Sequence, residues 1–337
     1  MKAFFKAATA LAAFFLFSCE RNIESKSKEL LPEHFPPVVH EFNADSLLES
    51  EIQLGRKLFY DPILSLDSSI SCGSCHAQTH GFADHNIAVS FGVNGAVGSR
   101  NTPPLVNLAW HESYMLDGGI NHLELVPLAP ITHELEMNLE IREALRRLNK
   151  NSEYTNHFTE VYYSDTITTA LLFKALTSFQ LTLVSAKSKY DEVQRGTKQF
   201  TTLEQQGEDL FLEHCSSCHQ PPLFSDFSFA NNGLDSVYSD AGRGRITQRA
   251  QDSGRFKVPT LRNLAFTYPY MHDGRFQTLD QVIAHYSNLE NSGNYFDQRY
   301  DGSTLGSTYD KKALKAFLNT LNDYEFISDL QHSEPIN

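Results

Sequence analysis

Two short motifs of cysteine and histidine are the residues of this chain best suited to chemistry. Both read C-x-x-C-H, and they occupy residues 72–76 and 215–219. In this spacing, two thiols can bond to the two vinyl groups of one haem, and the adjacent histidine can bind the iron. Zinc knuckles or disulfides would not require a histidine after each second cysteine. The sequence therefore predicts two covalently bound haem c groups, held by Cys72, Cys75, His76, Cys215, Cys218 and His219.

The chain also carries one residue pattern twice. The string Q-x-G-x-x-L-F precedes both motifs, at 53–59 and 205–211. A longer string, P-x-L-x-N-L-A followed by Y-M-x-D-G, follows both motifs, at 103–118 and 259–274. Long shared patterns at a fixed offset indicate one haem-binding unit copied twice.

The segments around these motifs have sequence patterns typical of helices. Capping-box spacing predicts helix starts at Ser46 and at Thr202, and leucine and alanine periodicity predicts helices in 138–149 and 166–184. We therefore expect a mainly α fold of two duplicated cytochrome c-like haem domains with long loops and little sheet. The expected boundaries are 43–190 for the N-terminal domain and 191–337 for the C-terminal domain.

The N-terminal residues have the features of an export signal. Residues 1–18 combine two lysines with an apolar run that is too short to span a bilayer. Cys19 follows in the string L-F-S-C, which resembles a bacterial lipobox and favours lipidation of Cys19. The alternative is ordinary cleavage nearby, with Cys19 an incidental thiol. We expect a periplasmic lipoprotein in which 19–42, polar and proline-containing, is a tether, and the lipid is the only membrane contact.

Composition agrees with an exported globular protein. The 337 residues include 28 Lys and Arg against 41 Asp and Glu, a net charge of -13, which argues against nucleic-acid binding. Hydrophobic residues at 41% and charged residues at 20% are typical of a folded chain, and the length suits two domains.

Residues 45–325 resemble the bacterial di-haem cytochrome c peroxidase and MauG family. The strings that carry the resemblance are KLFYDPILS, CGSCH, GSRNTPPLVNLA and FKVPTLRNLAFTYPYMHDG, together with the two-haem layout. The resemblance implies reduction of hydrogen peroxide at the N-terminal haem, with electrons from a small c-type cytochrome or cupredoxin passing through the C-terminal haem. MauG relatives instead oxidise side chains of a protein partner. A di-haem electron carrier is a third hypothesis, and a homodimer is a further arrangement to consider.

Peroxide cleavage needs an open iron position and a nearby acid or base. Several candidates follow the first repeat, and the residues alone do not choose among them: Glu124, His133, Glu134, Glu136 and Glu140. The resemblance implies that Glu136 is catalytic. It also aligns Val93 with the distal histidine of many members, so we expect the N-terminal haem to be open at rest, with His80 and His85 as rival ligands.

For the C-terminal haem the resemblance implies Tyr286 as sixth ligand, with His285 or Met271 as alternatives. The tryptophan that the family usually places between the haems is Leu116 here, which weakens the MauG-like hypothesis, although Tyr114 could substitute. The only tryptophan is Trp110.

The resemblance further implies one calcium ion. Its protein ligands would be the Asn101 side chain and the backbone carbonyls of Thr267 and Pro269. Such oxygen donors suit a hard cation.

Overall fold

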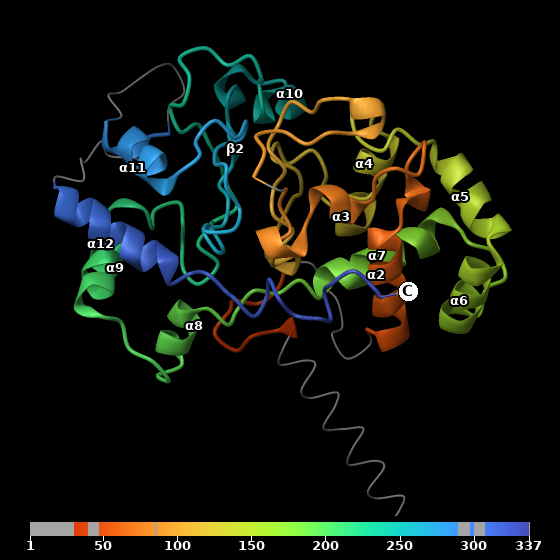
Figure 1. Ribbon diagram of the computed structural model, residues 1–337. Helices are drawn as coiled ribbons and strands as arrows, with labels where there is room; N and C mark the ends of the chain where they lie inside the picture. Colours follow the sequence, from red (N-terminus) through yellow and green to blue (C-terminus); the bar gives the residue numbers. More distant parts are fainter. Residues whose placement is uncertain (1–29, 40–46, 85, 289–296, 300–306, 337) are drawn as a thin grey trace, which may run out of the picture.

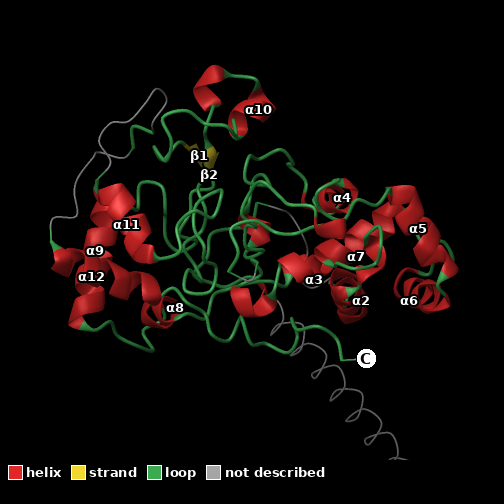
Figure 2. Cartoon of the chain, turned by 45° about the horizontal axis from the view of Figure 1, so that its top comes forward, coloured by secondary structure: helices red, strands yellow, loops and turns green. Residues whose placement is uncertain are grey.

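A computed structural model describes residues 30–39, 47–84, 86–288, 297–299 and 307–336. The predicted signal peptide, Cys19, Ser46 and His85 lie outside these residues. Two lobes lie side by side, with the N-terminal half of the chain in one and most of the C-terminal half in the other (Figure 1). Helices and long loops make up both lobes (Figure 2), and the described residues form one sheet of two short antiparallel strands, β1 (Phe229–Ala230) and β2 (Phe256–Lys257). The expected mainly α fold with little sheet is confirmed.

The first lobe is built around the helix that precedes the first haem motif. Its α-helices are α2 (Glu49–Tyr60), α3 (Cys72–Cys75), α4 (Leu128–Thr132), α5 (Ile141–Lys150), α6 (Ser152–Tyr162) and α7 (Thr169–Leu181). Short 3-10 helices join them: η2 (Pro62–Leu64), η3 (Gln78–His80), η4 (Val93–Gly95), η5 (Leu108–Trp110) and η6 (Leu123–Leu125). The helices predicted in 138–149 and 166–184 are therefore present as α5 and α7.

The second lobe repeats this plan with fewer helices. They are α9 (Thr202–His214), α10 (Arg243–Thr247), η7 (Ala250–Asp252), α11 (Leu279–Ser287) and α12 (Thr308–Asn319), and α8 (Lys189–Gln194) lies before them. The predicted cap of α9 was wrong by one residue. Thr201 is the N-cap, because its hydroxyl accepts the Glu204 N–H while the Glu204 carboxylate accepts the Thr201 N–H.

A glycine lets two helices cross closely in each lobe. A Cβ added to Gly55 of α2 would lie 1.9 Å from the carbonyl oxygen of Ala175 in α7. A Cβ added to Gly207 of α9 would lie 2.0 Å from the carbonyl oxygen of Ala313 in α12. No side chain fits at such distances, so the glycines in the repeated Q-x-G-x-x-L-F string are required by packing. The structure thereby adds α7 and α12 to the duplicated unit.

The second repeated string also folds alike in both lobes. The Asn107 N–H donates to the Leu183 carbonyl at 2.9 Å, and the Asn263 N–H donates to the Leu321 carbonyl at 3.2 Å. Both asparagines have positive φ, 54° and 67°. This conformation is unusual for residues other than glycine, although asparagine tolerates it better than most.

Residues 30–39, the first that the structure describes, pack against the segment around Trp110. The Val39 N–H donates to the Ala109 carbonyl at 3.0 Å, and the Trp110 indole N–H donates to the Pro36 carbonyl at 2.7 Å. The Phe35 and Trp110 rings meet edge to face, 5.1 Å apart. The described part of the predicted tether is therefore bound to the first lobe and is not an unpacked linker.

The C-terminal segment returns to the first lobe and runs beside α2 (Figure 1). The Tyr60 hydroxyl donates to the His332 carbonyl at 2.7 Å, and the Gln78 amide donates to the Asp329 carbonyl at 2.6 Å. Residues 326–333, which we expected in the C-terminal domain, thus pack against the N-terminal haem unit.

A buried ion pair ties α8 to the second lobe. Both Asp191 and Arg262 have fully buried side chains, and the guanidinium donates to both carboxylate oxygens, at 2.9 and 2.7 Å. His34 lies 2.9 Å from the same carboxylate, so the N-terminal segment joins this cluster. Among the described residues, no helix combines the length and apolar character needed to cross a membrane.

Candidate functional site

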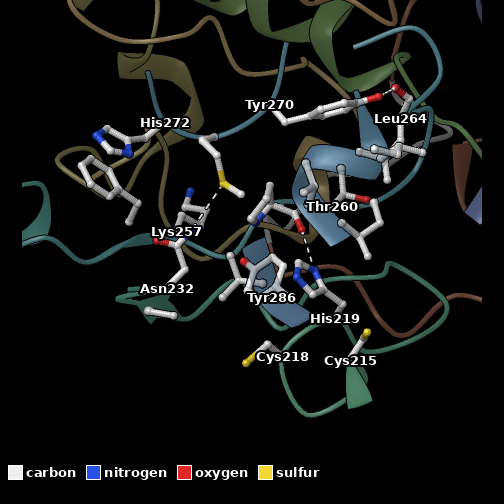
Figure 3. Close-up of a pocket in the computed structure, with 18 of the residues that line it drawn as sticks. Cys215, Cys218, His219, Asn232, Lys257, Thr260, Leu264, Tyr270, His272 and Tyr286 are labelled. Atoms are coloured by element: carbon white, nitrogen blue, oxygen red, sulfur yellow. Dashed lines mark hydrogen bonds between the residues drawn. The ribbon is translucent and has the colours of Figure 1, made fainter. Parts of the chain in front are cut away.

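The second haem motif opens onto a cavity of about 300 Å³ in the second lobe. Cys215, Cys218 and His219 line it from one side, and Tyr286 lies against the same space (Figure 3). The rest of its wall is largely apolar and includes Phe211, Leu261, Leu264, Val282, Ile283, Leu314 and Leu318. An apolar pocket with two thiols and an imidazole on its wall fits a covalently attached haem.

Both motif histidines are held in the tautomer that an iron ligand needs. Nδ1 of His219 lies 3.2 Å from the Phe224 carbonyl and 3.1 Å from the Pro259 carbonyl, and Nδ1 of His76 lies 2.8 Å from the Phe82 carbonyl. Because a carbonyl only accepts, Nδ1 must carry the proton, which leaves the lone pair on Nε2. Burial lowers the pKa of both imidazoles and favours the neutral form that binds metal.

The four motif cysteines are unpaired, so no disulfide competes for the thiols. Burial is the main reason that the pKa values of Cys72 and Cys215 are raised to about 12, and that of Cys75 to about 11. Burial thus favours the neutral form of these thiols.

In the first lobe, the loop that carries Val93 is fixed against Glu136. The Val93 N–H donates to the Glu136 carbonyl at 2.9 Å, and a Cβ on Gly92 would lie 2.1 Å from the Leu135 carbonyl oxygen. Val93 is buried, at 2% exposure. The structure thus brings together the residue expected in place of a distal ligand and the residue expected to transfer protons.

Glu136 is also within electrostatic reach of the haem-attachment thiols. Burial is the main cause of the raised pKa values of Cys72 and Cys75, and the negative charge of Glu136 adds to both. Its carboxylate lies 3.6 Å from the His133 Nδ1, with 45% of the side chain exposed. Burial raises the pKa of Glu136, and the charge of His133 opposes this shift.

The other residues of the first lobe that we considered for proton transfer or iron binding are placed differently from Glu136. His133 and the remaining carboxylates are exposed: Glu124, Glu134 and Glu140. His80 lies on η3 with Nδ1 3.0 Å from the Thr79 hydroxyl. Among the carboxylates considered, partial burial singles out Glu136.

Two candidate ligands of the second haem reach the cavity. Tyr286 and Met271 both line it, whereas Nε2 of His285 lies 3.0 Å from the Asn232 carbonyl and is engaged there. Burial raises the pKa of Tyr286 to about 12. Of the three residues considered as sixth ligand, Tyr286 and Met271 therefore line the cavity and His285 does not.

The residues between the two units have mainly packing roles. Leu116 lines the cavity, and its carbonyl accepts the Lys257 N–H at 2.8 Å. The Tyr114 hydroxyl donates to the Leu108 carbonyl at 3.3 Å, as Tyr270 does to Leu264 in the second unit. A phenol bonded to a carbonyl has no base to take its proton, so Tyr114 is poorly placed to replace a tryptophan relay.

Sequence reasoning missed Lys257, which is 8% exposed and lines the same cavity. Its ammonium group donates to the Ser113 carbonyl, and burial lowers its pKa to about 7. The repeat could have drawn attention to position 257, but nothing in the string FKVPTLRN shows that its lysine is buried.

The residues predicted to bind calcium also line this cavity: Asn101, Thr267 and Pro269. The Asn101 amide donates to the Ala88 carbonyl at 3.0 Å, which leaves its side-chain oxygen free to accept or to bind a cation. This donor set is compatible with calcium.

Comparison with known proteins agrees with this geometry. Residues 49–199 match the family model described as di-haem cytochrome c peroxidase. MauG of Methylorubrum extorquens is 35% identical over 258 residues, covering 74% of this chain and 72% of that protein. The cytochrome c551 peroxidase of Nitrosomonas europaea is 34% identical over 237 residues, covering 68% and 71%.

Among solved structures, a MauG-like protein associated with microbial copper homeostasis superimposes with a TM-score of 0.83. It is 31% identical, and the alignment covers 90% of this chain and 98% of that one. The diheme peroxidase BthA of Burkholderia thailandensis, 20% identical with a TM-score of 0.70, shares the fold. With two haem-attachment motifs in two copies of one unit, this chain belongs to the di-haem cytochrome c peroxidase and MauG family, whose members carry two haem c groups.

Proposed function

We propose that this protein is a periplasmic di-haem peroxidase that reduces hydrogen peroxide to water. Electrons would come from a small c-type cytochrome or cupredoxin and enter through the C-terminal haem. The observation that carries the proposal is the hydrogen bond from the backbone N–H of buried Val93 to the backbone carbonyl of Glu136, which holds these two residues next to each other. A valine cannot bind iron, so it would leave a coordination position of the N-terminal haem iron open, and the carboxylate of Glu136 would transfer protons there.

A haem held by Cys72, Cys75 and His76 would supply an iron able to bind peroxide and to pass electrons to it. Glu136 would take a proton from one peroxide oxygen and give it to the other, which would leave as water. Two electrons and two further protons complete the reduction of one peroxide to two waters. The raised pKa of Glu136 suits a group that must both accept and release a proton.

We further propose a calcium ion bound by Asn101 and by the backbone carbonyls of Thr267 and Pro269. Each of these residues lines the cavity of the second haem. Removal of the ion with a chelator is expected to shift the spectrum of that haem, and added calcium should restore it. We also propose that Cys19 carries the lipid that holds the protein at a membrane.

The decisive experiment is steady-state peroxide turnover by the holoenzyme with a panel of reduced small cytochromes and cupredoxins. We expect saturable oxidation of at least one donor, with two equivalents oxidised per peroxide. Absence of turnover with every donor, from a protein with both haems in place, would contradict the peroxidase proposal.

A MauG-like activity on a protein partner is the second candidate. It is favoured by Tyr286 at the cavity of the second haem and by the likeness to MauG and to the MauG-like structure. Leu116 opposes it, because an aliphatic side chain cannot carry charge between the haems. Peroxide added without an electron donor separates the two activities. Only the MauG-like activity would then leave oxidised side chains, detectable by mass spectrometry, on a protein partner.

A further inference from the structure

Lys257 is the one lysine or arginine among the described residues that line the cavity of the second haem. It lies on the side of this cavity away from Cys215 and Cys218 (Figure 3). A haem carries its two vinyl groups at one edge and its two propionates at the opposite edge. With the vinyl groups bonded to the cysteines, the propionate carboxylates would therefore lie toward the side of the cavity on which Lys257 stands.

The described residues give the Lys257 ammonium group no carboxylate partner. The group donates to the Ser113 carbonyl. The carboxylate whose charge acts on it, Asp117, is already paired with Arg100 at 2.7 Å and with Arg245 at 2.9 Å. Burial lowers the pKa of Lys257 to about 7, because a buried cation is costly unless an anion compensates its charge. An anionic group in the cavity would provide this compensation.

The surroundings of Lys257 carry an excess of positive charge. Asp117 accepts hydrogen bonds from two arginines through its carboxylate and from a third through its backbone carbonyl. One of these arginines also pairs with a second carboxylate, at 2.6 Å. With Lys257, the cluster holds four cations and two carboxylates: Lys257, Arg100, Arg243, Arg245, Asp117 and Asp240. In a chain with a net charge of -13, this local excess favours binding of an anion.

Both ends of Lys257 are held by residues 113–116, which belong to the first lobe. Its backbone N–H donates to the Leu116 carbonyl at 2.8 Å, and its ammonium group donates to the Ser113 carbonyl. The ammonium nitrogen also lies 5.8 Å from the centre of the Tyr114 ring. An ammonium group has three N–H donors, so the bond to Ser113 leaves two for a group in the cavity.

We propose that Lys257 binds a propionate of the C-terminal haem and fixes that edge of the haem against residues 113–116 of the first lobe. The inference needs the second haem but not peroxidase activity, so it stands apart from the proposed function. A cation beside the haem stabilises the electron that the haem receives. Lys257 therefore keeps the potential of this haem higher than it is without the charge.

Charge variants of the full-length holoenzyme test the proposal. Lys257→Met removes the ammonium group at similar length, Lys257→Gln keeps an N–H donor without the charge, and Lys257→Arg keeps the charge. In spectroelectrochemical titration, we expect the potential of the C-terminal haem to fall in Lys257→Met and Lys257→Gln and to stay near that of the wild type in Lys257→Arg. Lys315→Met is the matched control, because Lys315 lies on α12 of the same lobe and its ammonium group pairs with Asp280 at the surface. It should leave the potential unchanged.

The infrared spectrum of the propionates reports the contact itself. Haem isotopically labelled at the propionate carboxyls gives isotope-sensitive carboxylate bands in the difference spectrum recorded across the potential of this haem. We expect one of these bands to shift in Lys257→Met and Lys257→Gln, because the propionate loses its ammonium partner. The same band should stay in place in Lys315→Met.

The outcomes separate this inference from the proposed function. An unchanged potential in Lys257→Met and Lys257→Gln, with both haems in place, would overturn the inference and leave the peroxidase proposal intact. A lower potential without a shift of the labelled bands would also overturn it, because the charge would then act from a distance. Loss of the second haem from these two variants but not from Lys257→Arg would support anchoring by the charge. Loss from all three would assign Lys257 to folding and reject the inference.

Discussion

A carboxylate that shuttles protons beside a haem must be partly shielded from water, and Glu136 differs from its neighbours in this respect. Glu136→Gln keeps the shape of the side chain but removes the proton acceptor. We expect both haem spectra to be retained and peroxide turnover to fall by about 10^2- to 10^4-fold, the usual range for general acid–base catalysis. Glu134→Gln is the matched control, because Glu134 is exposed and two residues away. Equal turnover in the two variants would contradict the role of Glu136.

The pH dependence follows from the same carboxyl group. Burial raises the pKa of Glu136, and the group accepts a proton only when it is ionised. The rate of the peroxide reaction should therefore be full above this raised pKa and decline as the pH falls through it. Stopped-flow rates across the acidic range test this. The slow reaction that remains in Glu136→Gln should not decline at acidic pH. If the decline persists in this variant, another group must cause it.

The proposal that the first haem is open at rest depends on Val93. The fully oxidised protein should show a high-spin ferric haem by electron paramagnetic resonance and react with peroxide without prior reduction. Val93→His places an imidazole in this buried position beside Glu136 and is expected to convert that signal to low spin and to slow the reaction. A wild-type protein that is wholly low-spin would contradict the prediction and point to another ligand such as His80.

At the scale of the elements, the two glycine crossings hold the helix pairs. Gly55→Ala would force apart α2 and α7, and Gly207→Ala would force apart α9 and α12, because the added Cβ meets a backbone carbonyl in each case. Overpacking of this kind costs about 1–3 kcal/mol of unfolding free energy.

The loss of unfolding free energy is measured by denaturant unfolding, with the haem Soret absorption as the signal. Gly98→Ala is the control, since a Cβ added there would lie 3.4 Å from the Ser90 carbonyl oxygen, an ordinary contact distance. Equal midpoints for all three variants would show that the helices can separate at little cost.

At the scale of the whole molecule, the Asp191–Arg262 pair is buried where α8, the N-terminal segment and the second lobe meet. Asp191→Ala leaves the guanidinium of Arg262 buried without its carboxylate partner. Breaking a buried pair in this way costs about 3–5 kcal/mol, so we expect a marked fall in the thermal midpoint. Lys187→Ala, which removes an exposed pair with Glu325, should have little effect.

The pair also predicts how stability depends on pH. Burial alone would raise the pKa of Asp191, but hydrogen bonds from Arg262, His34 and Ser188 outweigh it, and the pKa lies well below the usual range. The stabilisation is therefore present above the unfolded aspartate pKa and is lost as the pH falls through the folded one. Asp191→Ala should flatten the acid dependence of the unfolding free energy.

Features that depend on local spacing could be predicted from the residues alone. Covalent attachment needs only two thiols and a histidine within five residues, so both haem sites could be read directly, and the copied strings indicated two units. The family resemblance pointed to Glu136, Val93 and Tyr286, which residue spacing alone could not single out.

Only the tertiary structure decided the features that depend on burial or on contacts between distant segments. The crossing of α7 on Gly55, the return of the C-terminal segment to α2 and the burial of Lys257 all join residues more than 100 positions apart. The contact between the Asn232 amide and the Met271 sulfur likewise joins separate segments. Such contacts arise when the chain buries its apolar surface, and no spacing within one segment encodes them.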